Sequence, residues 1–404
     1  MSKFKINLIH IHAVLALMGY WFCNSIVGLA YGGNSPASVS ILYRFIQMLI
    51  SIWVLFICRK DLVIKKKDRL LWMYAIVLVM YALRMFYDMI FGPFSMTLPP
   101  NVFMENIFMT VFGVFLSCIA LISSRKYIDI DRVILYIFIV GVVTIICVLK
   151  QISLTEFISL SEEERIDGGR GLSTLALVKI GAIVSLASLH LLINKHSLYS
   201  LFGLCLGLFL TFGSGSRGGL VALVLTIFLY ALIQAKKNII LITAISVAIV
   251  LFFINLVPIL EWLSNYFPVI SKRLLMSILE NDQSGRQELR QQAFQLISEN
   301  PLFGYSYRLG PSETGYGCHN GMLDLFLAFG VLGGLLSVII CFIYPFILAI
   351  KNIANKEIFF PVTLMMWIIV ASASSSGITN ETFGFAVALL GCSIYYKKRL
   401  RYDS

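Results

Sequence analysis

Charged residues are scarce in this chain of 404 residues. Asp, Glu, Lys and Arg together make up 13% of the sequence, whereas hydrophobic residues make up 59%. Charged residues are about a quarter of an ordinary water-soluble domain, so this composition excludes a soluble globular protein. It predicts an integral membrane protein.

Patterned cysteines and internal repeats are also missing. The eight cysteines include no Cys-x-x-Cys pair, so no disulfide framework is indicated. The sequence shows no repeat of fixed period and no low-complexity segment, which argues against a repeat architecture.

Long apolar runs are abundant instead. Each is about 20 residues, enough to cross a hydrocarbon core of about 30 Å as a helix. The fold class that we predict is therefore all-α, a polytopic membrane protein. The first run is expected to be retained, because it lacks a small-residue cleavage site and more spans follow it. We place about twelve transmembrane helices at residues 10–31, 40–58, 70–91, 102–122, 132–150, 172–193, 198–213, 219–235, 238–257, 321–350, 358–376 and 379–396.

The distribution of Lys and Arg predicts the orientation. Most of them fall in one alternate set of loops and in both terminal segments, such as RKDLVIKKKDR (59–69) and KKRLR (397–401). Cytoplasmic loops retain positive charge during insertion, so both termini are predicted to be cytoplasmic. This topology accounts for most of the net charge of +11, and we expect no nucleic-acid partner. No two of the five histidines share an outer-face loop, and we expect no metal or other cofactor.

The same topology divides the chain into three parts. Residues 1–257 form a membrane domain with helices one to nine, residues 258–320 form a large outer-face loop domain, and residues 321–404 form the last three helices and a cytoplasmic tail. The loop is too polar to lie in the membrane and too long to be a simple connection.

One short helix is predicted within this loop. Ser284 with Gln287 makes a capping-box pattern, and Asn300-Pro301 ends the helix. Its apolar stripe is expected to pack on the membrane domain and consists of Leu289, Ala293, Leu296 and Ile297. Arg286 and Arg290 fall on another face, either solvated or lining a site.

Charges at membrane level are few. They include Arg44, Lys179 and the pair Arg84 and Asp88. A charge in lipid is unfavourable by several kcal/mol unless it faces a partner or a cavity. For Arg84 and Asp88, at i,i+4 spacing, we favour an internal ion pair that orients helices.

Two glycine-rich turns carry an arginine on the outer face. GSGSRGG (213–219) surrounds Arg217, and IDGGRG (166–171) surrounds Arg170, each before an apolar helix. Glycines let the backbone approach a ligand, and amides at a helix start with a planar guanidinium group suit a phosphate or diphosphate. The alternative is two tight turns with ordinary juxtamembrane arginines, which the positive-inside bias disfavours here.

His319 stands at the start of an apolar helix on the same face. It follows GPSETGYGC (310–318), precedes Asn320 and lies near Asp324. A lone histidine in such a place is usually a hydrogen-bonded structural residue. Beside the arginines, however, a neutral imidazole could take a proton from an acceptor hydroxyl while the arginines hold an anionic leaving group.

These residues resemble the superfamily of O-antigen ligases and O-antigen polymerases, bacterial enzymes of surface-polysaccharide synthesis. His319-Asn320 followed after nine residues by Gly330-x-x-Gly333 fits its signature at the helix after the large periplasmic loop. SGRQELRQQAF (284–294), ENPLFGYS (299–306) and GSRGGL (215–220) are similar to its upstream segments. The resemblance is specific over about 210–335 and only topological before that.

The resemblance implies a GT-C-like glycosyltransferase in the bacterial inner membrane that acts in lipopolysaccharide biosynthesis without a metal. Its donor would be an undecaprenyl-diphosphate-linked oligosaccharide, and its partners an acceptor glycan or glycolipid, membrane lipids and a chain-length regulator. Carried to this sequence, Arg217 and Arg170 would bind the diphosphate and His319 would activate the acceptor. We predict substrate-binding roles for Ser216, Arg286, Arg290, Asn320 and Asp324.

Other functions are compatible with parts of this pattern. A polymerase, which we favour, passes the chain to a new lipid-linked repeat unit, whereas a ligase passes it to lipid A core, and the shared motifs do not separate the two. The intramembrane charges would also suit a multi-span transporter or flippase. Such proteins often consist of two related halves, whereas here the large loop is off-centre and the first half has no counterpart of His319. A structural scaffold is disfavoured by the clustered arginines.

Overall fold

The computed structural model describes most of the chain. It covers residues 3–31, 36–61, 69–151, 172–214, 216–234, 254–266, 286–310, 317–373 and 377–403, together with the single residues 243, 247, 251, 271 and 275.

Every secondary-structure element within these residues is helical. The first half comprises α1 (Lys3–Val14), η1 (Leu15–Gly19), α2 (Tyr20–Ala30), α3 (Ala37–Ile57), η2 (Arg59–Asp61), α4 (Arg69–Phe91), α5 (Pro100–Ile107), η4 (Phe108–Phe115), α6 (Leu116–Ser123), α7 (Ile130–Gln151) and α9 (Thr174–Lys195). The second half comprises α10 (Leu198–Gly213), α11 (Arg217–Gln234), α13 (Leu256–Leu263), α15 (Arg286–Glu299), α16 (Gly321–Val338), η6 (Ile339–Ile343), α17 (Tyr344–Asn352), η7 (Lys356–Ile358), α18 (Phe359–Ser372) and α19 (Glu381–Asp403). The all-α fold class is confirmed for this part of the chain.

The apolar runs form the expected helices. By length and composition, seven described helices are able to cross a membrane, and α10, α11 and α19 contain shorter apolar helices. Each predicted helix except 238–257, most of which lies outside the described residues, coincides with a helix of the structure. The count of twelve spans, the GT-C class and the division into three parts remain predictions.

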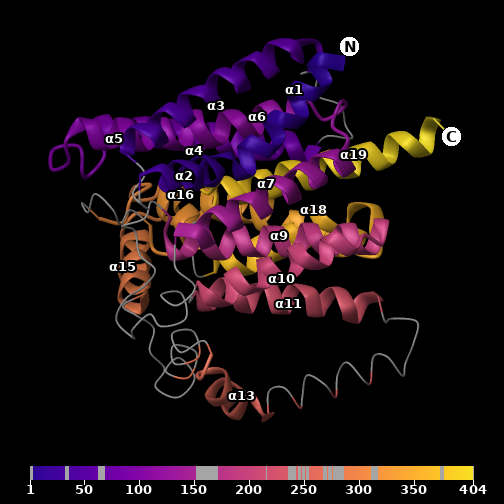
Figure 1. The fold of residues 1–404 in the computed structure, drawn as a ribbon. Helices are drawn as coiled ribbons and strands as arrows, with labels where there is room; N and C mark the ends of the chain where they lie inside the picture. The colour runs from indigo at the N-terminus through magenta and orange to yellow at the C-terminus, as the bar shows by residue number, and fades with distance from the viewer. Residues whose placement is uncertain are drawn as a thin grey trace.

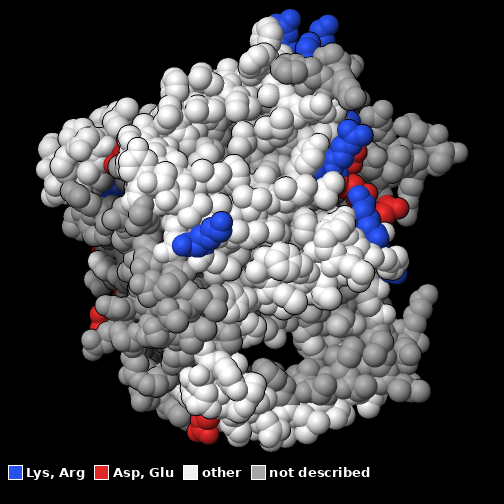
Figure 2. Space-filling model, viewed as in Figure 1, with Lys and Arg blue, Asp and Glu red and all other residues white. Residues whose placement is uncertain are grey.

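The long helices lie side by side in one bundle (Figure 1). Both termini lie at one end of the bundle, and α15 lies across the opposite end. We call the end next to α15 the loop end and the other the termini end. Figure 2 shows a broad uncharged face, with most of the visible Lys and Arg at the termini end. Their placement on the cytoplasmic side stays a prediction.

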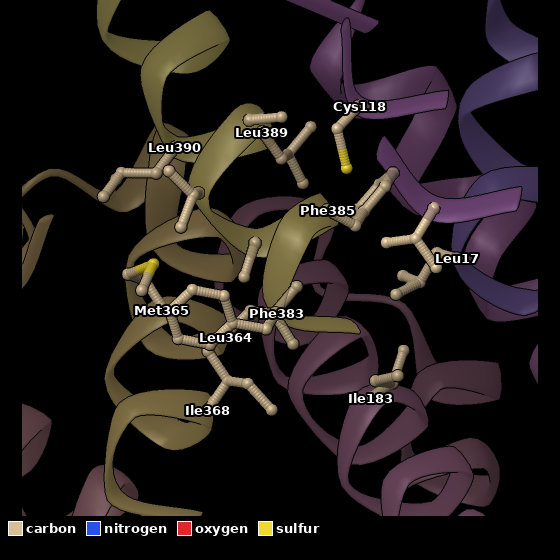
Figure 3. Packing of buried hydrophobic residues seen from close by; sticks show 14 of the residues in the cluster. Leu17, Cys118, Ile183, Leu364, Met365, Ile368, Phe383, Phe385, Leu389 and Leu390 are labelled. Carbon is tan, nitrogen blue, oxygen red and sulfur yellow. The ribbon is translucent and has the colours of Figure 1, made fainter. Parts of the chain in front are cut away.

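The helices differ in how much surrounds them. Almost every residue of α18 is buried, whereas α3 exposes large apolar residues such as Leu42 and Phe56. A helix that is hydrophobic all round is typical of a protein core or a membrane span. Figure 3 shows Phe383 and Phe385 of α19 packed near Leu364 and Met365 of α18 and Cys118 of α6. The core therefore lies around α18 and α19, and α3 lies at the rim of the bundle.

The loop helix packs as its apolar stripe predicts. α15 ends at Glu299, directly before Asn300-Pro301. Ala293 and Ile297 are buried in one cluster with Leu323 and Leu327 of α16, and Leu289 and Leu296 pack against this cluster. The expected packing of the loop helix on the membrane domain is confirmed. The predicted cap at Ser284 lies outside the described residues.

Candidate active site at the loop end

His319 occupies an unusual backbone position directly before α16. Its side chain is exposed, and its φ of 52° lies in the left-handed region. For a residue other than glycine this conformation is unfavourable by about 1–2 kcal/mol, and it persists where the surroundings fix it. The two residues beside His319 supply these surroundings.

Asn320 and Cys318 anchor the turn on either side of His319. Oδ1 of Asn320 accepts the amides of Met322 and Leu323, both at 3.1 Å, and so caps α16. Oδ1 of Asp324 accepts the amide and the thiol of Cys318, both at 3.0 Å. Burial, together with the Asp324 carboxylate, raises the pKa of the Cys318 thiol. The thiol therefore keeps its proton and can donate to Asp324.

These contacts give Asn320 and Asp324 a clear local role. Both side chains hold the turn that presents His319, and Asp324 is buried while doing so. Whether they also contact a substrate is not tested by these contacts, so their predicted substrate-binding roles stay predictions.

The predicted arginine turn is present between α10 and α11. Helix α10 ends at Gly213 and α11 begins at Arg217, which makes Arg217 the first residue of a helix. The carbonyl of Ser216 accepts the amide of Leu220 at 3.3 Å, and the amide of Ser216 contacts Oγ of Ser214 at 3.4 Å. The side chain of Arg217 lies outside the described part of the structure.

The first turn of α11 contacts both α9 and α18. A Cβ atom built on Gly219 would lie 2.7 Å from the side chain of Val178. The indole Nε1 of Trp367 donates to the carbonyl of Gly219 at 3.0 Å. Glycine at position 219 thus allows the start of α11 to pack closely on α9.

The far end of α18 leads back to His319. A guanidinium nitrogen of Arg290, from α15, donates to the carbonyl of Ala373 at 3.1 Å. A Cβ atom on Gly321 would lie 2.5 Å from Cα of Gly377, so the start of α16 contacts the segment after α18. These contacts bring Arg290 and Gly321, which is two residues after His319, to the C-terminal end of α18 and the segment that follows it. Through Trp367, the same helix connects them to the start of α11.

Two predicted residues are described only in part or not at all. Arg170 lies outside the described residues, although Ser173, three positions later, caps α9 by accepting the amide of Ala176 at 3.3 Å. Arg286 is the first residue of α15, but its side chain lies outside the described part. Among the described residues, no group of three His, Cys, Asp or Glu side chains is arranged to hold a metal ion.

Sequence reasoning missed how the segment 301–308 is held. This segment lies against a break in α16 at Gly330 and against the pair Arg84 and Asp88 of α4. The pair was predicted to orient helices, but it contacts the segment after the loop helix. The glycines of the segment ENPLFGYS and of the 330–333 motif were the available signals.

Comparison with known proteins identifies part of this region. Residues 202–338 match the family model Wzy_C, described as O-antigen ligase. This segment is similar to the O-antigen ligase family. The match supports the superfamily of O-antigen ligases and polymerases that the motifs predicted. No curated protein matches the chain.

The Wzy_C segment, residues 202–338, contains most of the candidate site. It includes His319 and both helix starts at Arg217 and Arg286, whereas Arg170 and the Arg84–Asp88 pair lie before it. The apolar helices and this match together indicate a helical membrane protein, one segment of which is similar to O-antigen ligases. The residues within this segment are therefore stronger candidates for the chemistry that the matching family shares.

Proposed function

We propose that this protein is a membrane glycosyltransferase that polymerises O-antigen-type repeat units. The donor is an oligosaccharide on undecaprenyl diphosphate, and the acceptor is a sugar hydroxyl at the periplasmic face of the bacterial inner membrane. The observation that carries the proposal is His319, exposed in an anchored left-handed turn at the loop end within the Wzy_C segment.

The proposed reaction needs a base and an anion site. The imidazole of His319 takes the proton of the acceptor hydroxyl as its oxygen forms a bond to the anomeric carbon of the donor. The bond from that carbon to the phosphate oxygen breaks, and undecaprenyl diphosphate leaves. Arg217 and Arg170 are proposed to hold the diphosphate, since guanidinium groups form paired hydrogen bonds with phosphate.

The location of the site suits a lipid-linked donor. A lipid-linked donor whose diphosphate lies beside the amides of a helix start can keep its apolar tail between the membrane-spanning helices. The first turn of α11, which begins at Arg217, has this position between α9 and α18. Placement of both termini in the cytoplasm belongs to this proposal and is supported by the Lys and Arg at the termini end.

The test is complementation of a deletion strain with variant proteins at matched membrane abundance. His319→Ala and His319→Asn are expected to lower surface glycan at least about 100-fold, the usual contribution of a general base. Asn tolerates the left-handed conformation, so His319→Asn separates loss of the imidazole from backbone strain. Arg217→Ala and Arg170→Ala are expected to lower glycan as well, and glycan is read on a gel.

The matched control is His196, the other non-glycine residue with positive φ in the described chain. Its φ is 48°, it is exposed, and it follows α9 at the termini end. His196→Asn is expected to keep normal glycan. Normal glycan from both His319 variants would exclude the base, and normal glycan from the His319, Arg217 and Arg170 variants alike would favour a transporter or scaffold.

Ligation is the second candidate, because the matching family is described as O-antigen ligase. The deletion strain separates the two activities. A single repeat unit on lipid A core indicates a polymerase, and bare core indicates a ligase. A chain-length regulator is proposed as a partner of the polymerase only.

A further inference from the structure

Helix α16 is broken at Gly330. This residue has a φ of 72° and a ψ of −169°, far from helical values. The break leaves backbone groups without partners in their own helix. The carbonyl of Leu327 accepts the amides of Tyr305 at 2.8 Å and Ser306 at 3.2 Å, and the amide of Val331 donates to the carbonyl of Pro301 at 2.7 Å. The segment 301–306 therefore completes the hydrogen bonds of the broken helix.

Two glycines make this contact feasible. Gly304 has a φ of 73°, and a Cβ atom there would lie 2.6 Å from the amide nitrogen of Gly330. A Cβ atom on Gly330 would lie 2.5 Å from the carbonyl oxygen of Pro301. Both positions require positive φ and a close backbone approach, which glycine alone provides without strain.

The other side of this segment is held by α4. Arg84 donates through Nη1 to the carbonyl of Phe303 at 2.7 Å and through Nη2 to the carbonyl of Tyr305 at 2.6 Å. Oδ2 of Asp88 accepts the amide of Tyr307 at 2.7 Å and the hydroxyl of Ser306 at 3.0 Å. Nε of Arg84 lies 2.9 Å from Oδ1 of Asp88.

The donor and acceptor of each of these hydrogen bonds are fixed by the groups involved. Backbone carbonyls face the arginine and a backbone amide faces the carboxylate, so the two side chains cannot exchange places. An ion pair that only orients helices would lack this polarity, because either order of charges would serve. Asp88 is buried, with 1% of its side chain exposed, so its two additional hydrogen bonds matter for its stability in the bundle.

The first part of α16 connects this region to His319. Residues 321–329 span about 13 Å at 1.5 Å per residue, from the turn at His319 to the break at Gly330. Leu323 and Leu327 of this half-helix pack on α15. A shift at the break therefore moves the half-helix that carries the turn of His319.

We infer that Arg84, Asp88 and the glycine pair form a latch that positions His319 and α15 for glycosyl transfer. The latch comprises Arg84, Asp88, residues 301–307 and Gly330. It makes Arg84 and Asp88 positioning residues that lie outside the Wzy_C segment. This inference rests on the proposed function for its catalytic consequence, whereas the latch itself can be tested without any reaction.

The experiment compares three variants: Asp88→Ala, Asp88→Asn and the exchanged pair Arg84→Asp/Asp88→Arg. Backbone amide hydrogen exchange is measured on each purified protein in detergent, and surface glycan is measured in complemented cells at matched abundance. In Asp88→Ala and the exchanged pair, we expect exchange at residues 303–307 to rise at least tenfold and glycan to fall at least tenfold. Asp88→Asn keeps an acceptor oxygen and is expected to be intermediate.

The exchanged pair decides between a latch and a simple ion pair. It keeps opposite charges at i,i+4 spacing, so restored glycan and restored protection would overturn the latch. Normal glycan from Asp88→Ala despite faster exchange would overturn the positioning role. If His319→Asn kept full glycan, the proposed function would fail, while hydrogen exchange at residues 303–307 would still decide the latch.

Discussion

Two ion pairs of the helical bundle, Arg44–Glu381 and Arg84–Asp88, have different kinds of partners. Arg44 of α3 and Glu381 of α19 join two helices through their side chains at 2.7 Å. Arg44 also lies over the ring of Tyr20 and donates to a single backbone carbonyl, that of Met109, at 3.4 Å. Arg84 and Asp88 belong to one helix and contact the backbone of a distant segment. The comparison teaches that an intramembrane pair can serve packing or can fix irregular backbone. The number of backbone partners distinguishes the two uses.

The largest effect is expected from closing the space between the two glycines of the latch. In Gly330→Ala the new methyl group meets the Pro301 carbonyl and the residue keeps a positive φ, which together destabilise the fold by about 3–4 kcal/mol. The unfolding temperature in detergent and the amount of surface glycan should both decrease. Gly310→Ala is the control, because no atom of the described residues lies within 4 Å of its Cβ position. Equal unfolding temperatures and equal amounts of glycan for the two variants would contradict the close contact of the two glycines in the latch.

Removing Glu381 should separate packing from catalysis. Glu381→Ala leaves Arg44 buried without its carboxylate, which is unfavourable by about 3 kcal/mol. We expect a lower unfolding temperature but normal glycan per folded protein, in contrast to Asp88→Ala. Glu381 also interacts with Lys179, and Glu381→Gln keeps a hydrogen-bonding group and should be milder. Loss of glycan from folded Glu381→Gln protein would end the contrast between the two pairs.

A smaller effect is expected from Arg84→Lys. The ammonium group keeps the charge but cannot donate to two carbonyls in the planar geometry of a guanidinium group. The loss of one hydrogen bond to a charged donor corresponds to about 1.5–3 kcal/mol. Hydrogen exchange should rise at Phe303 to Tyr305 and much less at Tyr307, whose amide still binds Asp88. A uniform rise over the whole segment would show that charge alone holds it.

The smallest effect is expected at the cap of α16. Asn320→Ala removes the acceptor for the amides of Met322 and Leu323, a change of about 1 kcal/mol. Asn320→Asp keeps that acceptor and should unfold at nearly the wild-type temperature. The latch pair should be insensitive to both variants, and exchange at residues 303–307 provides that measurement. If Asn320→Asp has normal stability but loses glycan, the amide group itself contacts the substrate.

Features that depend on the length or the helical period of an apolar run could be predicted from the sequence. Apolar length located the long helices, and the stripe from Leu289 to Ile297 predicted how α15 packs. The turn before Arg217 followed from its glycines and the helix that begins there. These features depend on neighbours in the sequence, so local physical rules reach them.

The latch could not be predicted in this way. Arg84 and the carbonyl of Phe303 are 219 positions apart, and nothing in either segment specifies the other. The positive φ of Gly330 is a property of the packed structure, because an apolar run with scattered glycines is predicted from the sequence to be one unbroken helix. The side chain of Arg217 and all of Arg170 lie outside the described residues, so their roles still rest on the pattern.

The separation of the latch along the chain has a consequence for synthesis in the cell. Helix α4 is inserted when its final partners are not yet translated, because residues 303–307 follow about 10–45 s later at 5–20 residues per second. During that interval, Arg84 and Asp88 can neutralise each other, since their i,i+4 spacing needs no other segment. Helix α4 therefore carries its own counter-ion during insertion, and residues 303–307, which are translated later, meet a binding place that is already formed.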